Sequence, residues 1–535
     1  MSRQTTMADA LANGDVSLGI ELGSTRIKAC AILDDGTVVA TGGHDWENQL
    51  VDGHWSYALD DVWGGLQAAY ADLVQTMRAD FGVTPTRFKA LGISAMMHGY
   101  LAFNAKGDLL VPFRTWRDTY TGKAAAQLTD AFQVNVPLRW SISHYYQEVL
   151  DGTDTVGDVD FLTTLAGYVH WRLTGQKVLG IGDAVGMFPI DSATRSYNPR
   201  MVDTFDHLAA AHGVTGSIVD RLPEIKIAGE DAGTLTAEGA ALLDPTGTLA
   251  AGIPLCPPEG DAGTGMVATN AVRPRTGNVS VGTSIFAMVV LEHDLARLHR
   301  EIDPVTTPAG HPVAMVHCNN GASEIATWMD LFAEAFAACG ADVAKGAIYD
   351  ALLTQALDAP GDAGGVLAYN NLSGEPVTGL VEGRPLVMRM PDARLSLANF
   401  MRAQLYAAFA ALAIGMDALD DEGAAVDVLY GHGGLFRTPV VAQKLLATAL
   451  GTPVALAKSA SEGGAWGIAV LAAYMASGSE ADLADYLDQQ VFPDAHPEPI
   501  TPSADEVAEF ATYLERYRAG LAAEASAVEA LPTHP

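Results

Sequence analysis

Two stretches of the chain share one pattern of apolar and polar positions. Residues 16–33 begin as an apolar strand, break at a glycine–hydroxyl triplet, and continue as a second apolar strand. Residues 277–291 repeat this pattern. Two strands around a short glycine-containing turn predict a β-hairpin, and its repetition predicts two domains of one type, with chance recurrence of a common triplet as the alternative. The two triplets are Gly23-Ser24-Thr25 and Gly282-Thr283-Ser284.

Strand and helix patterns alternate along the rest of the chain. Apolar residues recur at helical spacing over 62–77, and a short apolar run at 88–93 predicts a strand. Further helices are expected at 160–173 and 400–419, and a capping box at 503–506 predicts the start of a last one. Alternation of this kind is typical of layered α/β folds.

The length of the chain sets the number of domains. A chain of 535 residues is too long for one hydrophobic core. We therefore expect an N-terminal domain over 16–270 and a C-terminal domain over 271–535. Residues 1–15 are small and polar, and they are expected to form a flexible tail.

Charge and cysteine content narrow the possible partners. The net charge of −33 disfavours nucleic acid and anionic membranes, which would be repelled. The four cysteines are far apart and are expected to be free thiols in a reducing compartment. No apolar run approaches the roughly 20 residues of a spanning helix, and the N-terminus is unlike a signal peptide. We expect a soluble cytoplasmic protein.

The first hairpin carries a carboxylate, Glu21, just before its polar turn. A glycine–hydroxyl turn exposes N–H and O–H donors that bind phosphate oxygens, and two such turns can hold the two ends of a triphosphate. Because a carboxylate repels phosphate, Glu21 fits there only if Mg²⁺ lies between them, held directly or through water. The alternative is a solvent-facing Glu at a strand end.

Three other polar motifs are candidates for chemistry. Asp261 stands on a glycine-rich loop where a carboxylate can act as a general base, although Asp in such a loop more often serves the turn itself. His98 follows a strand and can reach a polar ligand, or it is a hydrogen-bonded structural residue. The glycines at 431–434 can admit a planar base, or they form a tight strand-to-helix turn.

The order of these motifs resembles that of the FGGY family of carbohydrate kinases, within the actin-like ATPase superfamily. The resemblance runs from Val16 to about Tyr517, and "MMHG" is most similar to the xylulose-kinase branch. It rests on "LGIELGSTRIK", "GHWSYALDDVW", "MMHGYLAFN", "FRTWRDTYT", "EGDAGTGM", "NVSVGTSIF", "GHGGLFRTPVVAQKLLATALGTPV" and "EGGAWGIAVLAAY". It implies two RNase H-like α/β domains with mixed central sheets flanked by helices and an active-site cleft between them.

The resemblance also implies roles for individual residues. Asp261 matches the catalytic base that takes the proton of the sugar hydroxyl. Glu21 and Asp261 are expected to face Mg²⁺. The residues expected to bind the sugar are Met97, His98 and Asp118, together with Asp261. The residues expected to bind ATP are Gly23, Ser24, Thr25, Gly282, Thr283, Ser284, Gly433, Gly434 and Phe436.

Two departures from the family pattern leave details open. Glu21 stands where relatives usually have Asp, and "WRDTYT" replaces a Trp-Asn-Asp-Gly-Arg pattern of xylulose kinases. The expected reaction is phosphorylation of a ketopentose such as D-xylulose to the 5-phosphate, with L-ribulose, other ketoses, polyols and sugar acids as alternatives. An actin- or chaperone-like ATPase switch and a sugar-sensing protein are the alternatives from other classes. A homodimer is one expectation for the assembly.

Overall fold

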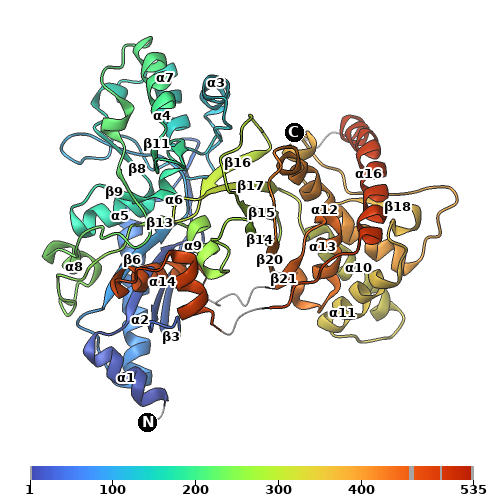
Figure 1. The fold of residues 1–535 in the computed structure, drawn as a ribbon, viewed down its shortest axis with the longest axis horizontal. Coiled ribbons are helices and arrows are strands. Elements are labelled where there is room, and N and C mark those ends of the chain that lie inside the picture. The colour runs from blue at the N-terminus through green and yellow to red at the C-terminus, as the bar shows by residue number, and fades with distance from the viewer. Residues whose placement is uncertain (1–2, 457–462, 494–496, 532–535) are drawn as a thin grey trace. The chain divides into compact units, whose positions relative to one another are not determined.

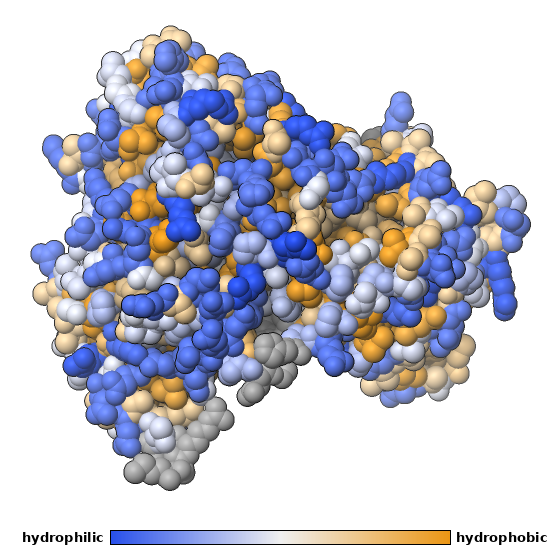
Figure 2. Space-filling view, viewed as in Figure 1, coloured by the Kyte–Doolittle hydropathy of each residue, from blue (hydrophilic) through white to orange (hydrophobic). Residues whose placement is uncertain are grey.

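The chain forms two compact units. The computed structural model describes residues 3–456, 463–493 and 497–531. The first unit comprises Met1–Arg273, Pro304–Val313 and Ser459–His496. The second comprises Pro274–Asp303, Ala314–Lys458 and Pro497–Pro535. On the face shown in Figure 2, hydrophilic side chains predominate and apolar ones are scattered among them, as expected when most apolar surface is in the cores.

The first unit is built around a mixed five-stranded sheet. Its strands lie in the order β13-β6-β1-β2-β3. Strands β1, β2 and β3 pair antiparallel, whereas β6 runs parallel to both β1 and β13. The bounds are β1 (Ser17–Leu22), β2 (Arg26–Ile32), β3 (Val38–Asp45), β6 (Ala90–Ala95) and β13 (Glu259–Gly260).

Helices cover both faces of this sheet. A Cβ at Gly19 of β1 would lie 2.1 Å from the carbonyl oxygen of Ala465, so α14 (Gly463–Ser477) packs directly on that strand. A Cβ at Gly42 of β3 would lie 2.2 Å from the nitrogen of Leu73, so α2 (Leu59–Phe81) packs equally closely. Through β2, Gly42 is in register with Ile20, the residue after Gly19. Because successive residues of a strand face opposite sides of the sheet, α14 and α2 lie on opposite faces. Figure 1 shows the orange-red α14 beside the blue strands.

Smaller elements complete the first unit. Its other helices are α1 (Arg3–Asn13), α3 (Gly122–Phe132), α4 (Ser141–Asp151), α5 (Leu165–Thr174), α6 (Ile181–Ala184), α7 (Pro199–Ala210), α8 (Ala237–Leu243), α9 (Asp261–Ala268) and α15 (Leu483–Tyr486). Its other strands are β4 (Gln49–Val51), β5 (His54–Ser56), β7 (Leu101–Phe103), β8 (Phe161–Thr163), β9 (Val178–Gly180), β10 (Ile190–Asp191), β11 (Ser196–Tyr197) and β12 (Glu224–Lys226).

The sheet of the second unit repeats the arrangement of the first. Its six strands lie in the order β16-β17-β15-β14-β20-β21, and the last five correspond to the five of the first unit. The β14–β15 hairpin is antiparallel, and β20 runs parallel to β14 and β21, as β6 does to β1 and β13. The duplication predicted from the two hairpins is therefore confirmed. The bounds are β14 (Thr276–Val281), β15 (Ile285–Val290), β16 (Ile302–Thr306), β17 (Pro312–Cys318), β20 (Val428–Gly433) and β21 (Val454–Leu456). Strands β18 (Val366–Tyr369) and β19 (Leu386–Arg389) form a separate two-stranded sheet.

One long helix forms the centre of the second unit's core. Helix α12 (Leu397–Asp421) is capped at its N-terminus by Ser396, whose side chain accepts the N–H of Asn399. It is long and apolar enough to cross a membrane, but its apolar window is 78% buried, as in the core helix of a globular domain. The other helices are α10 (Ser323–Ala338), α11 (Lys345–Gln355), α13 (Val441–Leu450) and α16 (Ala504–Ala530).

Three sequence expectations differ from the structure. Residues 3–13 form helix α1 instead of a flexible tail, because Leu11 is buried and Met7 packs against the core. A helix was expected over 160–173, but Phe161–Thr163 form strand β8, which pairs with β7. The helix, α5, begins only after its N-cap, Thr164. Helix α14 was expected in the second domain, but it belongs to the first unit because it packs on β1. The capping box of α16, between Ser503 and Glu506, is confirmed.

Candidate active site

The carboxyl ends of three parallel strands meet at one edge of the first unit's sheet. Glu21 of β1 is in register with Ser94 of β6, which is in register with Glu259 of β13. One residue further on, the register joins Leu22, Ala95 and Gly260. Ligands of open α/β sheets bind outside this edge of parallel strands. The residues that follow the strands, including Asp261, therefore stand where a ligand is expected.

Asp261 is the first residue of α9. Its Oδ1 accepts the backbone N–H of Met97 at 3.2 Å, which orients the carboxylate. Surrounding protein raises the pKa of the carboxyl group by desolvation, and the N–H groups of Met97 and Ala262 oppose that effect. The residue is nevertheless accessible to solvent. An oriented and accessible carboxylate can accept a proton when it is ionised.

The segment after β6 places His98 beside Asp261. His98 and Gly99 have φ values of 69° and 87°, a conformation that costs a non-glycine residue about 1–3 kcal/mol and that clusters at functional sites. Burial, and next the charge of Arg139, hold the pKa of His98 well below 6.5, so its ring is neutral. Its Nδ1 is buried against the backbone of Gly186, where a Cβ would lie 2.6 Å from it. The Met97 side chain packs on Gly260, where a Cβ would lie 2.1 Å from its Cγ.

Two carboxylates at this edge fit Mg²⁺ bound together with a nucleotide. The register puts β1 and β13 two strand spacings apart, so the backbones of Glu21 and Asp261 are separated by roughly 10 Å. Glu21 is half-buried beside Gly464, where a Cβ would lie 2.3 Å from its Oε1. No group of three or more His, Cys, Asp or Glu that could hold a metal occurs in the described part of the chain. Mg²⁺ typically takes one or two carboxylates plus phosphate oxygens and water.

The first glycine–hydroxyl turn is held by three aromatic side chains. Trp46 donates its indole N–H to the carbonyl of Gly23 at 2.7 Å, and Tyr57 donates its hydroxyl to the carbonyl of Ser24 at 2.6 Å. Trp116, which is 41% exposed, donates to the Ser24 hydroxyl at 3.0 Å. Sequence reasoning missed these three residues, although two of them lie in motifs that carry the resemblance. The turn is fixed in place, the Gly23 N–H is donated to the Arg26 carbonyl, and Thr25 is exposed to solvent.

Asp118 lies close to this turn but is itself covered. Its side chain is 4% exposed. Its Oδ2 lies 2.5 Å from Nδ1 of His54, and its Oδ1 accepts the N–H of Tyr120 at 3.0 Å. Both carboxylate oxygens are therefore engaged within the chain. His54 is a further polar residue of this region that sequence reasoning missed.

The second unit gathers its own glycine-rich motifs at one sheet edge. Val281, the residue before the Gly282-Thr283-Ser284 turn, is in register with Gly433 of β20. Gly433 has a φ of 115°, and a Cβ there would lie 2.3 Å from the carbonyl oxygen of Val281. A Cβ at Gly434 would meet nothing within 4 Å. Phe436 is buried in the core beneath Gly431 and is not presented to a ligand.

Two buried acids lie behind Asp261. Asp183 and Glu259 are 0% and 1% exposed, and one oxygen of each has no hydrogen-bond partner among the described residues. Burial raises the pKa of Asp183 to about 7 and that of Glu259 well above 4.5. Thr164 donates its hydroxyl to Asp183 at 2.6 Å. Nothing in the sequence around Asp183 distinguishes it from an aspartate in a surface turn.

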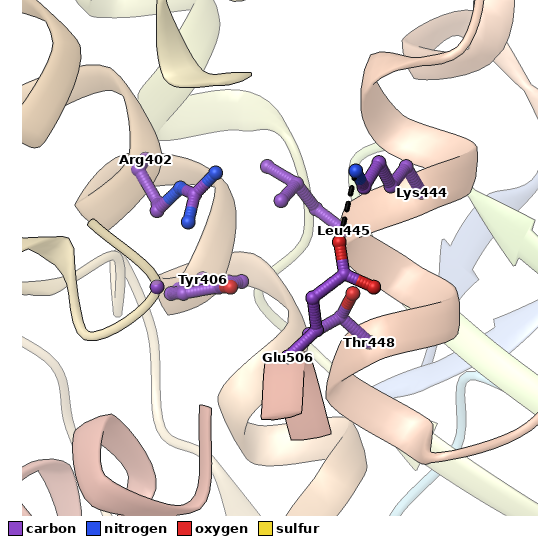
Figure 3. A pocket seen from close by; sticks show the side chains of 7 residues that line it. Arg402, Tyr406, Lys444, Leu445, Thr448 and Glu506 are labelled. Carbon is purple, nitrogen blue, oxygen red and sulfur yellow. Dashed lines mark ion pairs between the residues drawn. The ribbon is translucent and has the colours of Figure 1, made fainter. Parts of the chain in front are cut away.

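A small pocket in the second unit is not a substrate site. Figure 3 shows Lys444 paired with Glu506, with Arg402 and Tyr406 on the other side. The volume is about 10 Å³, room for about one water molecule.

The comparisons with known proteins identify the family. Residues 16–267 match the N-terminal domain, and residues 277–476 the C-terminal domain, of the FGGY family of carbohydrate kinases. The chain belongs to this family. It is 23% identical over 298 residues to the xylulose kinase of Escherichia coli, in an alignment that covers 52% of this chain and 55% of that enzyme.

Solved structures share the fold over nearly the whole chain. A xylulose kinase from Rhodospirillum rubrum superposes with a TM-score of 0.76 at 20% identity, covering 95% of this chain and 98% of that structure. A gluconate kinase from Lactobacillus acidophilus superposes with a TM-score of 0.73 at 17% identity, covering 95% and 99%. At these identities the likeness extends to the fold, and the two structures are named for different substrates. Both are two-domain α/β structures, as this chain is.

Proposed function

We propose that this protein transfers the γ-phosphoryl group of ATP to a hydroxyl group of a sugar. The observation that carries the proposal is the placement of Asp261, an exposed carboxylate oriented by the N–H of Met97 at the ligand-binding edge of the first unit's sheet. Membership of a family of carbohydrate kinases supports the same reaction.

Asp261 acts as the general base. It takes the proton of the sugar hydroxyl as the hydroxyl oxygen attacks the γ-phosphorus in line with the departing ADP oxygen. The sugar binds to the first unit beside Asp261, with the neutral ring of His98 and the segment around Met97 in contact with it. A neutral imidazole can hydrogen-bond a hydroxyl group without the cost of burying a charge.

The two glycine–hydroxyl turns bind the phosphates, and the second unit binds adenosine. Backbone N–H groups and hydroxyls aimed at the phosphoryl oxygens stabilise the charge that develops in the transition state. Glu21 and Asp261 are the residues that would hold Mg²⁺, which supplies neutralisation of phosphate charge when it is bound. The base and ribose of ATP lie against Gly433 and Gly434, since a Cβ at Gly434 would meet nothing within 4 Å.

The first substrate to test is a ketopentose, with D-xylulose ahead of L-ribulose. Relatives described as xylulose kinases support this choice. The gluconate kinase among the structural neighbours keeps sugar acids on the same list, together with other ketoses and polyols.

A screen for sugar-dependent ADP release tests the proposal. Purified protein, ATP and Mg²⁺ are mixed with each ketose, aldose, polyol and sugar acid in turn, and ADP is measured with a coupled enzyme. At least one sugar should raise ADP release well above the rate without sugar, and the product should carry one phosphate by mass. ATP hydrolysis that no sugar stimulates would favour an ATPase switch and overturn the proposal.

A further inference from the structure

An aspartate and a histidine from distant parts of the chain form a close pair in the first unit. Nδ1 of His54, on β5, lies 2.5 Å from Oδ2 of Asp118. The histidine side chain is 23% exposed and the aspartate 4%. The aspartate is therefore the covered member of the pair, and the histidine is the one that a ligand can reach.

The pair fixes which ring nitrogen of His54 carries the proton. A carboxylate accepts hydrogen bonds, so Nδ1 of His54 carries the proton that it donates to Asp118. This assignment leaves Nε2 as the nitrogen for a ligand. Nε2 can then accept a hydrogen bond from a sugar hydroxyl.

The surrounding contacts hold the pair rigidly. The Thr115 N–H donates to the Trp55 carbonyl at 2.9 Å, which ties β5 to the segment that carries Asp118. The Asp118 N–H donates to the Thr115 carbonyl at 3.0 Å. The ring of Tyr120 meets the His54 ring edge-on, with centroids 5.3 Å apart and planes at 89°. The backbone bonds fix the two segments relative to each other, and the Tyr120 ring packs against the His54 ring.

The pair borders the residues assigned to the sugar. A Cβ at Gly99, next to His98, would lie 3.5 Å from the Cα of Thr115. In the same segment, Trp116 donates to the Ser24 hydroxyl. The segment that carries Asp118 therefore contacts the turn at His98 and Gly99 through Thr115, and the first glycine–hydroxyl turn through Trp116. His54 is held beside this segment by its bond to Asp118.

We propose that His54 is a substrate-binding residue whose Nε2 hydrogen-bonds a hydroxyl group of the sugar, and that Asp118 is a positioning residue that orients the imidazole. This rests on the proposed kinase function. It changes the role expected for Asp118, which acts through His54 and not by direct contact with the sugar.

Asparagine and glutamine separate the two nitrogens of His54. In His54→Asn the amide can replace Nδ1 and still donate to Asp118, but nothing reaches the position of Nε2. In His54→Gln the longer side chain can bring its amide to the position of Nε2. Loss of one hydrogen bond predicts a sugar KM raised by about 2- to 12-fold in His54→Asn, a smaller rise in His54→Gln, and an unchanged KM for ATP in both.

Asp118→Asn tests the positioning role. It should raise the sugar KM by less than His54→Asn does. In the double variant the effects should not add, because Asp118 acts only through the histidine. The matched control is His207→Asn, an exposed histidine on α7 whose ring bonds only its own helix, at the Asp203 carbonyl; its KM values should equal those of the wild type.

Different results reject different claims. Wild-type protein that phosphorylates no sugar would reject the kinase, and with it this role. An active wild type combined with an unchanged sugar KM in His54→Asn would reject His54 alone. A rise in both KM values with a lower melting temperature would show that the pair is structural, and additive effects in the double variant would reject Asp118 as the positioning residue.

Discussion

The backbone N–H of Met97 donates a hydrogen bond to Oδ1 of Asp261 over 3.2 Å. The segment expected to contact the sugar and the expected catalytic base are therefore directly joined. Strand β6 ends two residues before Met97, and β13 ends directly before Asp261, so the parallel pairing of these strands brings the two residues together. A change in either residue is expected to disturb the other.

His98 is expected to affect the sugar and not the nucleotide. Asn is the substitution of choice at a φ of 69°, because Asn tolerates this conformation better than other non-glycine residues. Loss of the ring should raise the sugar KM by about 2- to 12-fold, the equivalent of one hydrogen bond. Steady-state kinetics with each substrate varied in turn measure this. An unchanged sugar KM would return His98 to a structural role.

Gly434 is expected to affect the nucleotide and not the fold. A side chain there would meet nothing within 4 Å, so Gly434→Val should leave the melting temperature nearly unchanged while occupying the space assigned to adenosine. Calorimetric titration should show weaker ATP binding and unchanged sugar binding. The matched control is Gly346→Val on α11, whose Cβ would likewise meet nothing within 4 Å. Unchanged ATP affinity in Gly434→Val would remove this residue from the site.

Glu21 is expected to matter for Mg²⁺. Glu21→Gln keeps the shape and removes the charge, so it should raise the Mg²⁺ concentration for half-maximal rate and lower kcat, with little change in melting temperature. A Glu at a solvated strand end would instead be replaceable within about ±0.5 kcal/mol of stability and without effect on the rate. The control is Glu238→Gln, at an exposed position of α8. Wild-type Mg²⁺ dependence in Glu21→Gln would contradict the assignment.

Glu21→Asp asks how the carboxylate meets the metal. The shorter side chain withdraws the charge by one methylene group. Activity between those of the wild type and Glu21→Gln would indicate direct contact at a fixed distance. Activity equal to that of the wild type would indicate contact through water.

Asp183 should make stability depend on pH. Its pKa is about 7 in the folded chain and 3.8 when unperturbed. Between about pH 4 and pH 7 the folded chain retains a proton that the unfolded chain has released, so the free energy of unfolding falls as the pH rises through this window. Asp183→Asn should reduce the fall in melting temperature between pH 5 and pH 8. Glu259, whose pKa is also raised, should preserve part of it. An unchanged pH dependence in Asp183→Asn would contradict the prediction.

The sequence predicts those parts of the fold and of the site that depend on residues close together in the chain. The two hairpins could be predicted because apolar strands and a glycine turn lie within a few residues of one another. The glycine-rich loop expected around Asp261 was wrong, because Asp261 begins helix α9 and Gly263 and Gly265 lie within that helix. The pairing of His54 with Asp118 could not be predicted, because it joins residues 64 apart that meet only when β5 packs against the segment after β7. For the same reason nothing in the sequence placed α14 against β1.

The most direct test of the account is the turnover of Asp261→Asn with the sugar that the wild-type protein prefers. The substitution keeps the size of the side chain and its acceptor for the Met97 N–H, but removes the base. We expect kcat to fall by about 10²- to 10⁴-fold, the usual contribution of a general base, while calorimetry shows an ATP affinity close to that of the wild type. A variant that retains more than about a tenth of wild-type kcat would contradict the central claim that Asp261 accepts the proton of the sugar hydroxyl.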